Sequence, residues 1–153
     1  MNQQESIEFA RTFLENIIAF FGTNISVTAR ADEDVIELDV EASELNSILI
    51  GRNAETLRSL QYMVSTALRN HDAALYRVNV DVAGYKQQRA EQVAEKARGW
   101  IEEVRRTGDS HIAHLGAADR RVVHRVASEY EDIHTFSEGE GRERHLIIAQ
   151  RSS

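Results

Sequence analysis

The feature that most constrains this chain is the order in which the spacing of its apolar residues changes. Over residues 5–21, apolar side chains recur every three or four positions, which predicts a helix. Residues 25–30 and 36–41 then alternate between apolar and polar side chains, which predicts two antiparallel strands with one face in water. The chain is therefore expected to begin with a helix and a strand pair.

Two helices and a third strand complete this first pattern. Ser43 is expected to cap a short helix over residues 43–50, and apolar spacing predicts a longer helix over 57–68. Alternation returns in a strand over residues 75–82. The order α-β-β-α-α-β describes a sheet with helices on one face, so we predict a closed α+β domain over residues 1–84.

The second half of the chain shows a different order. A helix of roughly 20 residues is expected over 85–107, and another over 117–130. Two short apolar runs, 133–136 and 146–149, are separated by a glycine-rich turn and predict a closing hairpin. We therefore predict a second domain over residues 85–153, in which a small sheet packs on helices.

Composition limits the setting in which the chain works. Its 153 residues are 42% hydrophobic, enough for a buried core, and the absence of cysteine excludes disulfides and favours a reducing compartment. The first residues lack the basic stretch of a signal peptide, and no apolar run approaches the length of a membrane span. These features predict a cytoplasmic protein that does not contact a membrane.

Charge is distributed unevenly along the chain. The net charge of −7 comes from residues 1–84, which hold 6 arginines against 13 acidic residues, whereas residues 85–153 hold 12 basic and 12 acidic residues. An acidic net charge argues against nucleic-acid binding. Between Gly51 and Arg77, however, four arginines stand against two acidic residues, so a local basic surface is compatible with the overall charge.

Gly51 lies between two predicted helices, in the segment Gly51-Arg52-Asn53-Ala54. A glycine here permits a positive φ and a close approach of another backbone, and the converging helix ends present free N–H groups that suit a phosphate. Arg52 is the charged candidate for a phosphate contact, and Asn53 can add a neutral hydrogen bond. On spacing alone, a plain turn between two helices is the alternative.

The helix predicted over residues 117–130 has a basic polar face. At about 100° per residue, the valines fall on one side, and the other side carries Arg120, Arg121, His124 and Arg125. Arg120 and His124 are four positions apart, so they project side by side and can grip one phosphate, or a phosphate and a base edge. A solvated helix face is the alternative explanation.

Within the order α-β-β-α-α-β, the segment around Gly51 resembles the GxxG loop of a KH domain of the bacterial, type II topology. In that family the loop clamps about four nucleotides of single-stranded backbone. Ala54 stands where the family has its second glycine, and an alanine restricts φ and adds a Cβ where RNA approaches. The resemblance therefore implies a KH fold whose loop binds RNA weakly or not at all.

The pair Arg120-x-x-x-His124, after a long helix and before a hairpin, resembles the R-3-H domain, a small binder of single-stranded nucleic acid. Ser137 and Arg144 also stand where that family has its closing hairpin. Residues 141–142 differ from those of relatives, which include proline here, so the turn of the hairpin is expected to differ.

The two modules in this order make the chain similar to the Jag/KhpB family of bacterial RNA-binding proteins, over residues 25–149. The resemblance implies a non-enzymatic protein that binds single-stranded RNA, with single-stranded DNA as a second partner, and acts as a post-transcriptional regulator or an RNA chaperone-like protein. It implies no cofactor, and the N-terminal Jag domain of many relatives is not expected here. The residues expected at the nucleic acid are Gly51, Arg52, Asn53, Ala54, Arg120, Arg121, His124, Arg125, Ser137 and Arg144.

A protein-interaction adaptor with a decayed RNA-binding loop is the alternative function. Ala54 and the acidic N-terminal half favour the adaptor, whereas the face formed by Arg120 and His124 favours nucleic-acid binding. Salt-sensitive binding to a nucleic-acid strand separates the two.

Four of the five phenylalanines lie in the first predicted helix, whose apolar arc spans about half its circumference. One stripe is expected to cover the first sheet. We expect the other to meet the second domain, a second copy of the chain or a separate small KH-domain protein, with burial inside a single core as the alternative. The two stripes are Ile7, Leu14, Ile18 and Phe21 on one edge, and Phe9, Phe13 and Phe20 on the other.

Metal binding and catalysis have little support in the sequence. His111 and His114 have a spacing compatible with one helical face, but spacing places no third ligand, so no metal site is predicted. Ser128, Ser137 and the carboxylates are not arranged in any known catalytic spacing. No catalytic residue is predicted.

Overall fold

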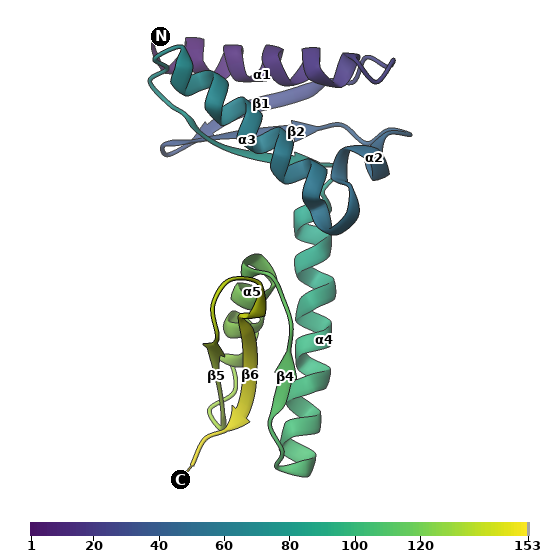
Figure 1. The fold of residues 1–153 in the computed structure, drawn as a ribbon, viewed down its shortest axis with the longest axis vertical. Helices are drawn as coiled ribbons and strands as arrows, with labels where there is room; N and C mark the ends of the chain where they lie inside the picture. The colour runs from purple at the N-terminus through teal and green to yellow at the C-terminus, as the bar shows by residue number, and fades with distance from the viewer. Residues whose placement is uncertain (153) are drawn as a thin grey trace. The chain divides into compact units, whose positions relative to one another are not determined.

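The computed structural model describes residues 1–152 and divides into two compact units, Met1–Lys86 and a second unit that begins at Gln87. Each unit combines helices with a three-stranded sheet, so the predicted α+β class is confirmed (Figure 1). One long helix, α4 (Tyr85–Thr107), begins in the last residues of the first unit and continues in the second.

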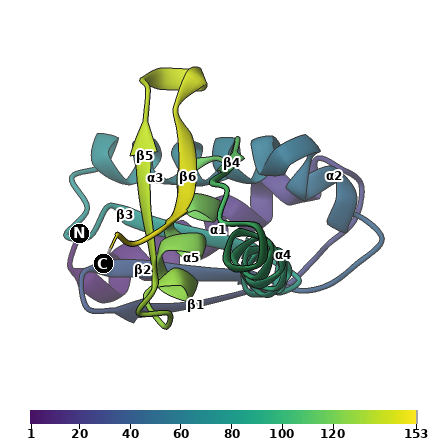
Figure 2. The same cartoon turned by 90° about the horizontal axis from the view of Figure 1, so that it is seen from below.

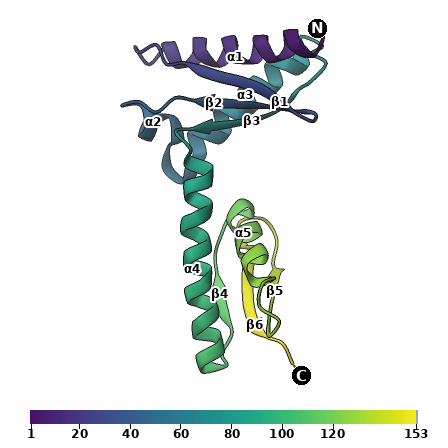
Figure 3. The same cartoon turned by 180° about the vertical axis from the view of Figure 1, so that it is seen from behind.

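The first unit is a sheet whose strands are linked by a helical crossover. Strands β1 and β2 pair antiparallel, whereas β2 and β3 pair parallel, so the chain must cross between the last two through α2 and α3. In Figure 1, α3 passes in front of the strands, and in Figure 3, seen from behind, the strands lie in front of it. The elements in chain order are α1 (Gln3–Ala19), β1 (Val27–Asp32), β2 (Val35–Val40), α2 (Asn46–Ile50), the short 3-10 helix η1 (Arg52–Ala54), α3 (Glu55–Asn70) and β3 (Arg77–Val82).

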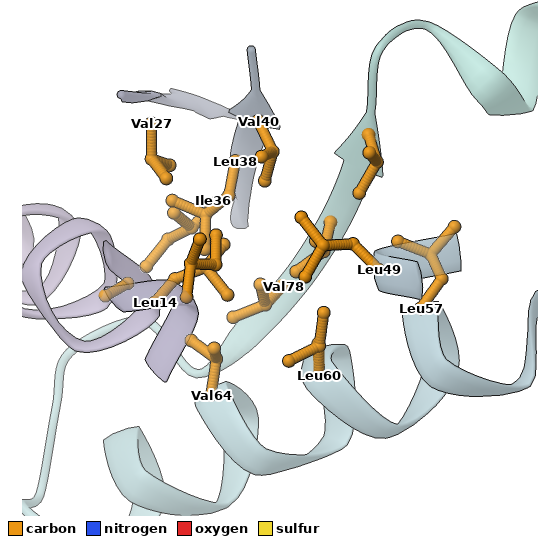
Figure 4. Close-up of a cluster of buried hydrophobic side chains, with 14 of the residues drawn as sticks. Leu14, Val27, Ile36, Leu38, Val40, Leu49, Leu57, Leu60, Val64 and Val78 are labelled. Carbon is orange, nitrogen blue, oxygen red and sulfur yellow. The ribbon is translucent and has the colours of Figure 1, made fainter. Parts of the chain in front are cut away.

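Alternation along the strands directs one face of this sheet into a core shared with the helices (Figure 4). Residues Ile36, Leu38 and Val40 of β2 are buried against side chains from α1 and α3. Helix α1 begins in a capping box, in which Asn2 accepts from the Glu5 backbone N–H and Glu5 accepts from the Asn2 N–H. Other core residues are Leu14, Ile18, Leu49, Leu57, Leu60, Val64, Leu68, Val78, Val80 and Val82.

The other face of this sheet is polar and mainly acidic. Asp39 of β2 is the cross-strand neighbour of Asp81 in β3. Glu37, one pair along, accepts a hydrogen bond of 2.7 Å from the side-chain amide of Asn79. Strand alternation therefore places Asp32, Glu37, Asp39 and Asp81 on this face.

Most side chains on both apolar edges of helix α1 pack within its own unit. Phe9 and Phe13 pack against the core of the first unit, with ring centroids 5.8 Å apart. The second stripe is therefore largely internal, which was the alternative interpretation of this helix. Phe20, at the end of the helix, is 92% exposed, and Phe21 is also exposed.

The prediction that Ser43 caps a helix was wrong. The N-cap position of α2 is Leu45, and Ser43 lies in a turn ahead of it. Its hydroxyl accepts from the Leu45 N–H at 3.1 Å, and its own N–H donates to the Asn46 side chain at 2.8 Å. Serine makes such local turns as readily as it caps helices, so the residue type alone did not separate the two.

The second unit packs the rest of α4 and a second helix against one face of an antiparallel sheet of order β4-β6-β5 (Figure 2). Its core joins α4, through Ala97 and Ile101, to Val123 of α5 and to Leu146 and Ile148 of β6. After α4, the elements are β4 (His111–Ala113), α5 (Ala117–Ala127), β5 (Ile133–Glu138), the short 3-10 helix η2 (Gly141–Glu143) and β6 (His145–Gln150).

Three details of the second unit differ from the predictions. Helix α5 ends at Ala127, with Ser128 at the C-cap, rather than at Tyr130. Strand β5 runs on to Glu138, into the predicted turn. His111 lies in strand β4, which pairs with β6, so the helical face that it was expected to share with His114 does not exist.

Within residues 1–152, no helix is both long enough and apolar enough to cross a membrane.

Candidate nucleic-acid interface

Helix α5 is fixed in the second unit by its apolar side and by one ion pair. Val123 and Val126 are buried in the core, which turns the polar side of the helix outward. In the first turn, Asp119 accepts from the Arg89 guanidinium of α4 at 2.9 Å and complements the positive end of the helix dipole. The basic residues therefore stand on a helix that is held in place by contacts on its other sides.

Arg120 is anchored by a contact to the loop that precedes the helix. Its Nη1 donates a hydrogen bond of 2.6 Å to the carbonyl of Leu115, and the side chain is half-buried. A guanidinium has five N–H donors, so this bond sets the direction of the side chain and leaves other donors for an anion. The anchor reduces the side-chain entropy that Arg120 would lose on binding.

His124 is half-buried beside strand β5. A hydrogen bond joins its Nδ1 to the hydroxyl of Thr135. Burial lowers the pKa of His124 below its ordinary value, and the positive charge of Arg120 lowers it further. Both effects favour the uncharged imidazole in the free protein.

Arg121 and Arg125 extend the positive charge along the exposed side of α5. Neither is ion-paired within the described residues, whereas Arg105 and Arg89 of α4 are paired with aspartates. Their charge is therefore available to a ligand.

Ser137 and Arg144 come from the hairpin that follows α5. Ser137 is two residues after Thr135 in β5, so both lie on the face of the strand that packs toward the helix. The Arg144 guanidinium donates a hydrogen bond of 2.9 Å to the Gly139 carbonyl and holds the hairpin turn. The structure thus places Ser137 on the strand face that contacts His124, while Arg144 has a structural contact of its own.

The predicted loop of the first unit is a tight left-handed turn between α2 and α3. Gly51 has φ +76°, and Asn53 and Ala54 have φ +55° and +60°. A Cβ on Gly51 would stand 2.3 Å from the Thr56 hydroxyl, so this position requires glycine for packing as well as for its backbone angle. Ala54 adopts a left-handed conformation in which an L side chain is strained.

The sequence analysis missed two residues that the structure adds to these sites. Arg58, one turn into α3, donates a hydrogen bond of 2.7 Å to the Asn53 carbonyl and brings a second guanidinium to the loop beside the exposed Arg52. Thr135 orients the His124 ring. The available signal for Thr135 was its two-residue spacing from Ser137, which places both hydroxyls on one strand face.

Histidine clustering does not produce a metal site in residues 1–152, where no group of three or more histidine or acidic side chains could hold an ion. His111 stacks on Trp100, with ring centroids 4.8 Å apart, and burial lowers its pKa. His114 lies against His145 instead. His111 and His114 therefore contact different aromatic rings.

Two comparisons relate this chain to known proteins. A model of the R-3-H domain matches residues 88–150, which lie within the second unit. The RNA-binding protein KhpB of Bacillus subtilis is 26% identical over 150 residues, which cover 96% of this chain and 72% of that protein. The protein of the same name from Clostridium symbiosum is 29% identical, over 96% of this chain and 65% of its own length.

A third relative, KhpB of Streptococcus pneumoniae, is 23% identical over 89% of this chain. The chain covers 42% of that protein, so these relatives differ in how far they extend beyond the matched region.

Proposed function

Because the chain is a KhpB/Jag-type protein with an R-3-H domain, we propose that it binds single-stranded RNA. The observation that carries the proposal is the geometry of Arg120 and His124. One is anchored by a backbone carbonyl and the other by a strand hydroxyl, and both lie on a helix whose other exposed arginines are unpaired within the described residues. The relatives are named as RNA-binding proteins, which supports RNA as the strand.

In this proposal, Arg120 binds a phosphate through the donors that its contact with Leu115 leaves free. His124 approaches the same phosphate or an adjacent base edge through Nε2, because Nδ1 is engaged by Thr135. Arg121, Arg125 and Ser137 contact the neighbouring backbone, while Arg144 keeps the hairpin in place and adds charge. No reaction is needed in this arrangement, so the protein acts as a binder rather than an enzyme.

We also propose that the first unit is a type II KH domain over residues 1–84 and that residues 85–153 form the R-3-H domain. The element order α1-β1-β2-α2-α3-β3, with β2 and β3 parallel, supports the first assignment. The loop Gly51–Ala54 is then a second RNA contact through Arg52, Asn53 and the first N–H groups of α3. Its Ala54 Cβ makes this contact the weaker of the two.

At the level of the cell, we propose a post-transcriptional role, as a regulator or an RNA chaperone-like protein in the cytoplasm. Contacts to the backbone and to a few bases suit an RNA binder of broad specificity, because phosphate contacts carry no sequence information directly.

An interaction adaptor is the second candidate function. The acidic open face of the first sheet, with Asp39 opposite Asp81, repels a phosphate backbone and favours a basic protein partner. Phe20, which is highly exposed, favours contact with a second copy or with a separate small KH-domain protein.

Fluorescence anisotropy separates the two functions. Labelled single-stranded RNA, single-stranded DNA and duplex RNA are titrated with the full chain at two salt concentrations. RNA binding predicts tight binding to the single strands, with an affinity that falls as salt rises, by a slope of about 0.7 per phosphate contact. If no strand shows salt-sensitive binding, the RNA proposal is wrong and the adaptor remains.

A further inference from the structure

The sheet of the second unit has an open face that the proposed helix site does not use. Alternation in β5 directs Thr135 and Ser137 toward the helices, and it directs His134 and Phe136 to the opposite side. Ile147 of β6 is the cross-strand neighbour of Phe136 on one side and of Ile112 on the other. Phe136 is 37% exposed and Ile112 is 55% exposed, so an apolar row crosses this open face.

Two flat rings lie at one end of the row. His134 and Phe136 stack with their centroids 5.5 Å apart and their planes at 17°. Within residues 1–152, Nδ1 of His134 is the one buried side-chain nitrogen or oxygen without a hydrogen-bond partner. Buried polar atoms are almost always paired in folded proteins, so this unpaired nitrogen is an exception that contacts among the described residues do not explain.

An arginine that follows β6 shares a hollow with His134. The Nε of Arg151 donates a hydrogen bond of 3.2 Å to the Ile133 carbonyl, and the Arg151 backbone N–H donates to the Asp132 carbonyl at 2.8 Å. A shallow, open hollow of about 330 Å³ is lined by His134, Arg151 and Ser152. Arg151 has no carboxylate partner in the part of the chain that the structure describes, so its charge faces this hollow uncompensated.

Charged side chains border the outer face at both ends. Arg151 lies at the end of β6, whereas at the hairpin end Glu138 lies 3.8 Å from His145. Asp132, at the Arg151 end, is ion-paired with Arg105. An aromatic pair near an arginine that lacks a carboxylate partner suits a flat ring that carries an anionic group. A purely apolar protein surface would gain nothing from the uncompensated arginine.

We propose that this outer face, formed by Ile112, Phe136, His134, Ile147 and Arg151, is a second contact surface for single-stranded nucleic acid. A nucleobase stacks on the Phe136 ring, and the adjoining phosphate pairs with the Arg151 guanidinium. The proposal rests on the proposed RNA-binding function and extends it. Strand β5 is an edge strand, so a bound strand that leaves His124 can pass over this edge to reach Phe136.

The first test requires no substitution. The wild-type full chain is irradiated with oligouridylate that carries 4-thiouridine, and crosslinked peptides are identified by mass spectrometry. The proposal predicts crosslinks at His134 or Phe136 as well as on α5. Crosslinks on α5 without any on the outer face of β5 would overturn it.

The second test uses substitutions at Phe136. Phe136→Leu keeps an apolar side chain but removes the ring, so RNA affinity should fall about tenfold, whereas Phe136→Trp should retain or raise it. Phe20→Leu, at an exposed phenylalanine of the first unit, is the matched control and should bind like the wild type. Arg151→Gln should lower the salt slope by about 0.7. Thermal unfolding followed by circular dichroism verifies that each variant is folded.

The outcomes separate this inference from the function on which it rests. If the wild type binds RNA and Phe136→Leu binds equally well, the outer-face proposal is wrong and the helix site stands. If the wild type binds no RNA, the proposed function fails first. If Phe136→Leu alters self-association in light scattering but leaves RNA affinity unchanged, the outer face is a protein interface and the proposal is overturned.

Discussion

The loop of the first unit and helix α5 of the second both present arginine near the end of a helix, but they are built differently. On α5, Arg120 is anchored to a carbonyl and His124 to a hydroxyl before any ligand arrives. In the loop, Arg52 is exposed, and the backbone around it is held in left-handed angles that Ala54 adopts under strain. We infer that the loop mainly specifies the fold, whereas α5 is prepared for contact with a nucleic acid.

The largest effect expected from this comparison is on stability, at Gly51. Gly51→Ala would bring a Cβ to 2.3 Å from the Thr56 hydroxyl and 2.9 Å from its backbone nitrogen. We expect the first unit to lose about 3 kcal/mol of unfolding free energy. Urea unfolding, with hydrogen exchange to locate the loss, measures it.

Gly99→Ala is the matched control for Gly51→Ala, because Gly99 is interior to α4 and a Cβ there meets nothing within 4 Å in the described residues. It should stabilise the protein by about 0.5–1 kcal/mol. If Gly51→Ala and Gly99→Ala change the unfolding free energy equally, the loop does not have the structural role assigned to it.

The next effect is on RNA affinity, where the two sites should separate. Combined Arg120→Ala and His124→Ala should weaken binding by about 2 kcal/mol, since both anchored groups are lost. Arg52→Ala should cost less than about 1 kcal/mol, as for other exposed charges. Anisotropy titration ranks the variants, with Arg98→Ala on the exposed side of α4 as the control. The reverse ranking would move the main site to the first unit.

A smaller gain is expected from Ala54→Gly, which relieves the φ of +60°. The unfolding free energy should rise by about 0.5–1 kcal/mol, the relief of strain being partly offset by the freedom that glycine adds to the unfolded chain. RNA affinity should stay equal or increase if the loop touches RNA. A loss of stability in urea unfolding would show that Ala54 is not strained.

The smallest effect concerns the protonation of His124. Because its pKa is lowered in the folded protein, its contribution to stability is complete above the unfolded-state pKa of about 6.5 and declines as pH falls through that value toward the folded pKa. NMR titration of the histidine rings isolates His124 from His111, whose pKa is also lowered.

Adding RNA should raise the His124 pKa if a phosphate approaches the ring, so affinity should increase toward low pH. If the midpoint of the His124 titration is the same with and without RNA, the phosphate does not bind next to this ring.

The sequence predicted the larger elements because their periodicity extends over many residues. Helix α5 and strands β1, β2 and β3 all exist where apolar spacing placed them, with ends that differ by up to three residues. Strand β4 was missed because three residues, His111–Ala113, are too few to show alternation. Their pairing partner, β6, lies far along the chain, so no local pattern shows the pairing.

For the candidate site, the sequence identified which residues project together, but not what holds them. The spacing of Arg120 and His124 follows from helix geometry. The contacts with Leu115 and Thr135 depend on a loop path and a strand register that no local pattern contains. For Ala54, the sequence predicted only that alanine restricts φ. It did not predict that φ is positive, because the sign of φ depends on how the chain turns from α2 into α3.

The close approach of Thr56 to Gly51 also bears on how related sequences should be interpreted. A glycine demanded by its own neighbour is required whether or not the protein ever meets RNA. A sequence search that scores this loop by its first glycine would therefore find chains that share the turn, whether or not they bind RNA. The residue at position 54 and the charges at positions 52 and 58 are better markers of the chains in which the turn still holds a strand of RNA.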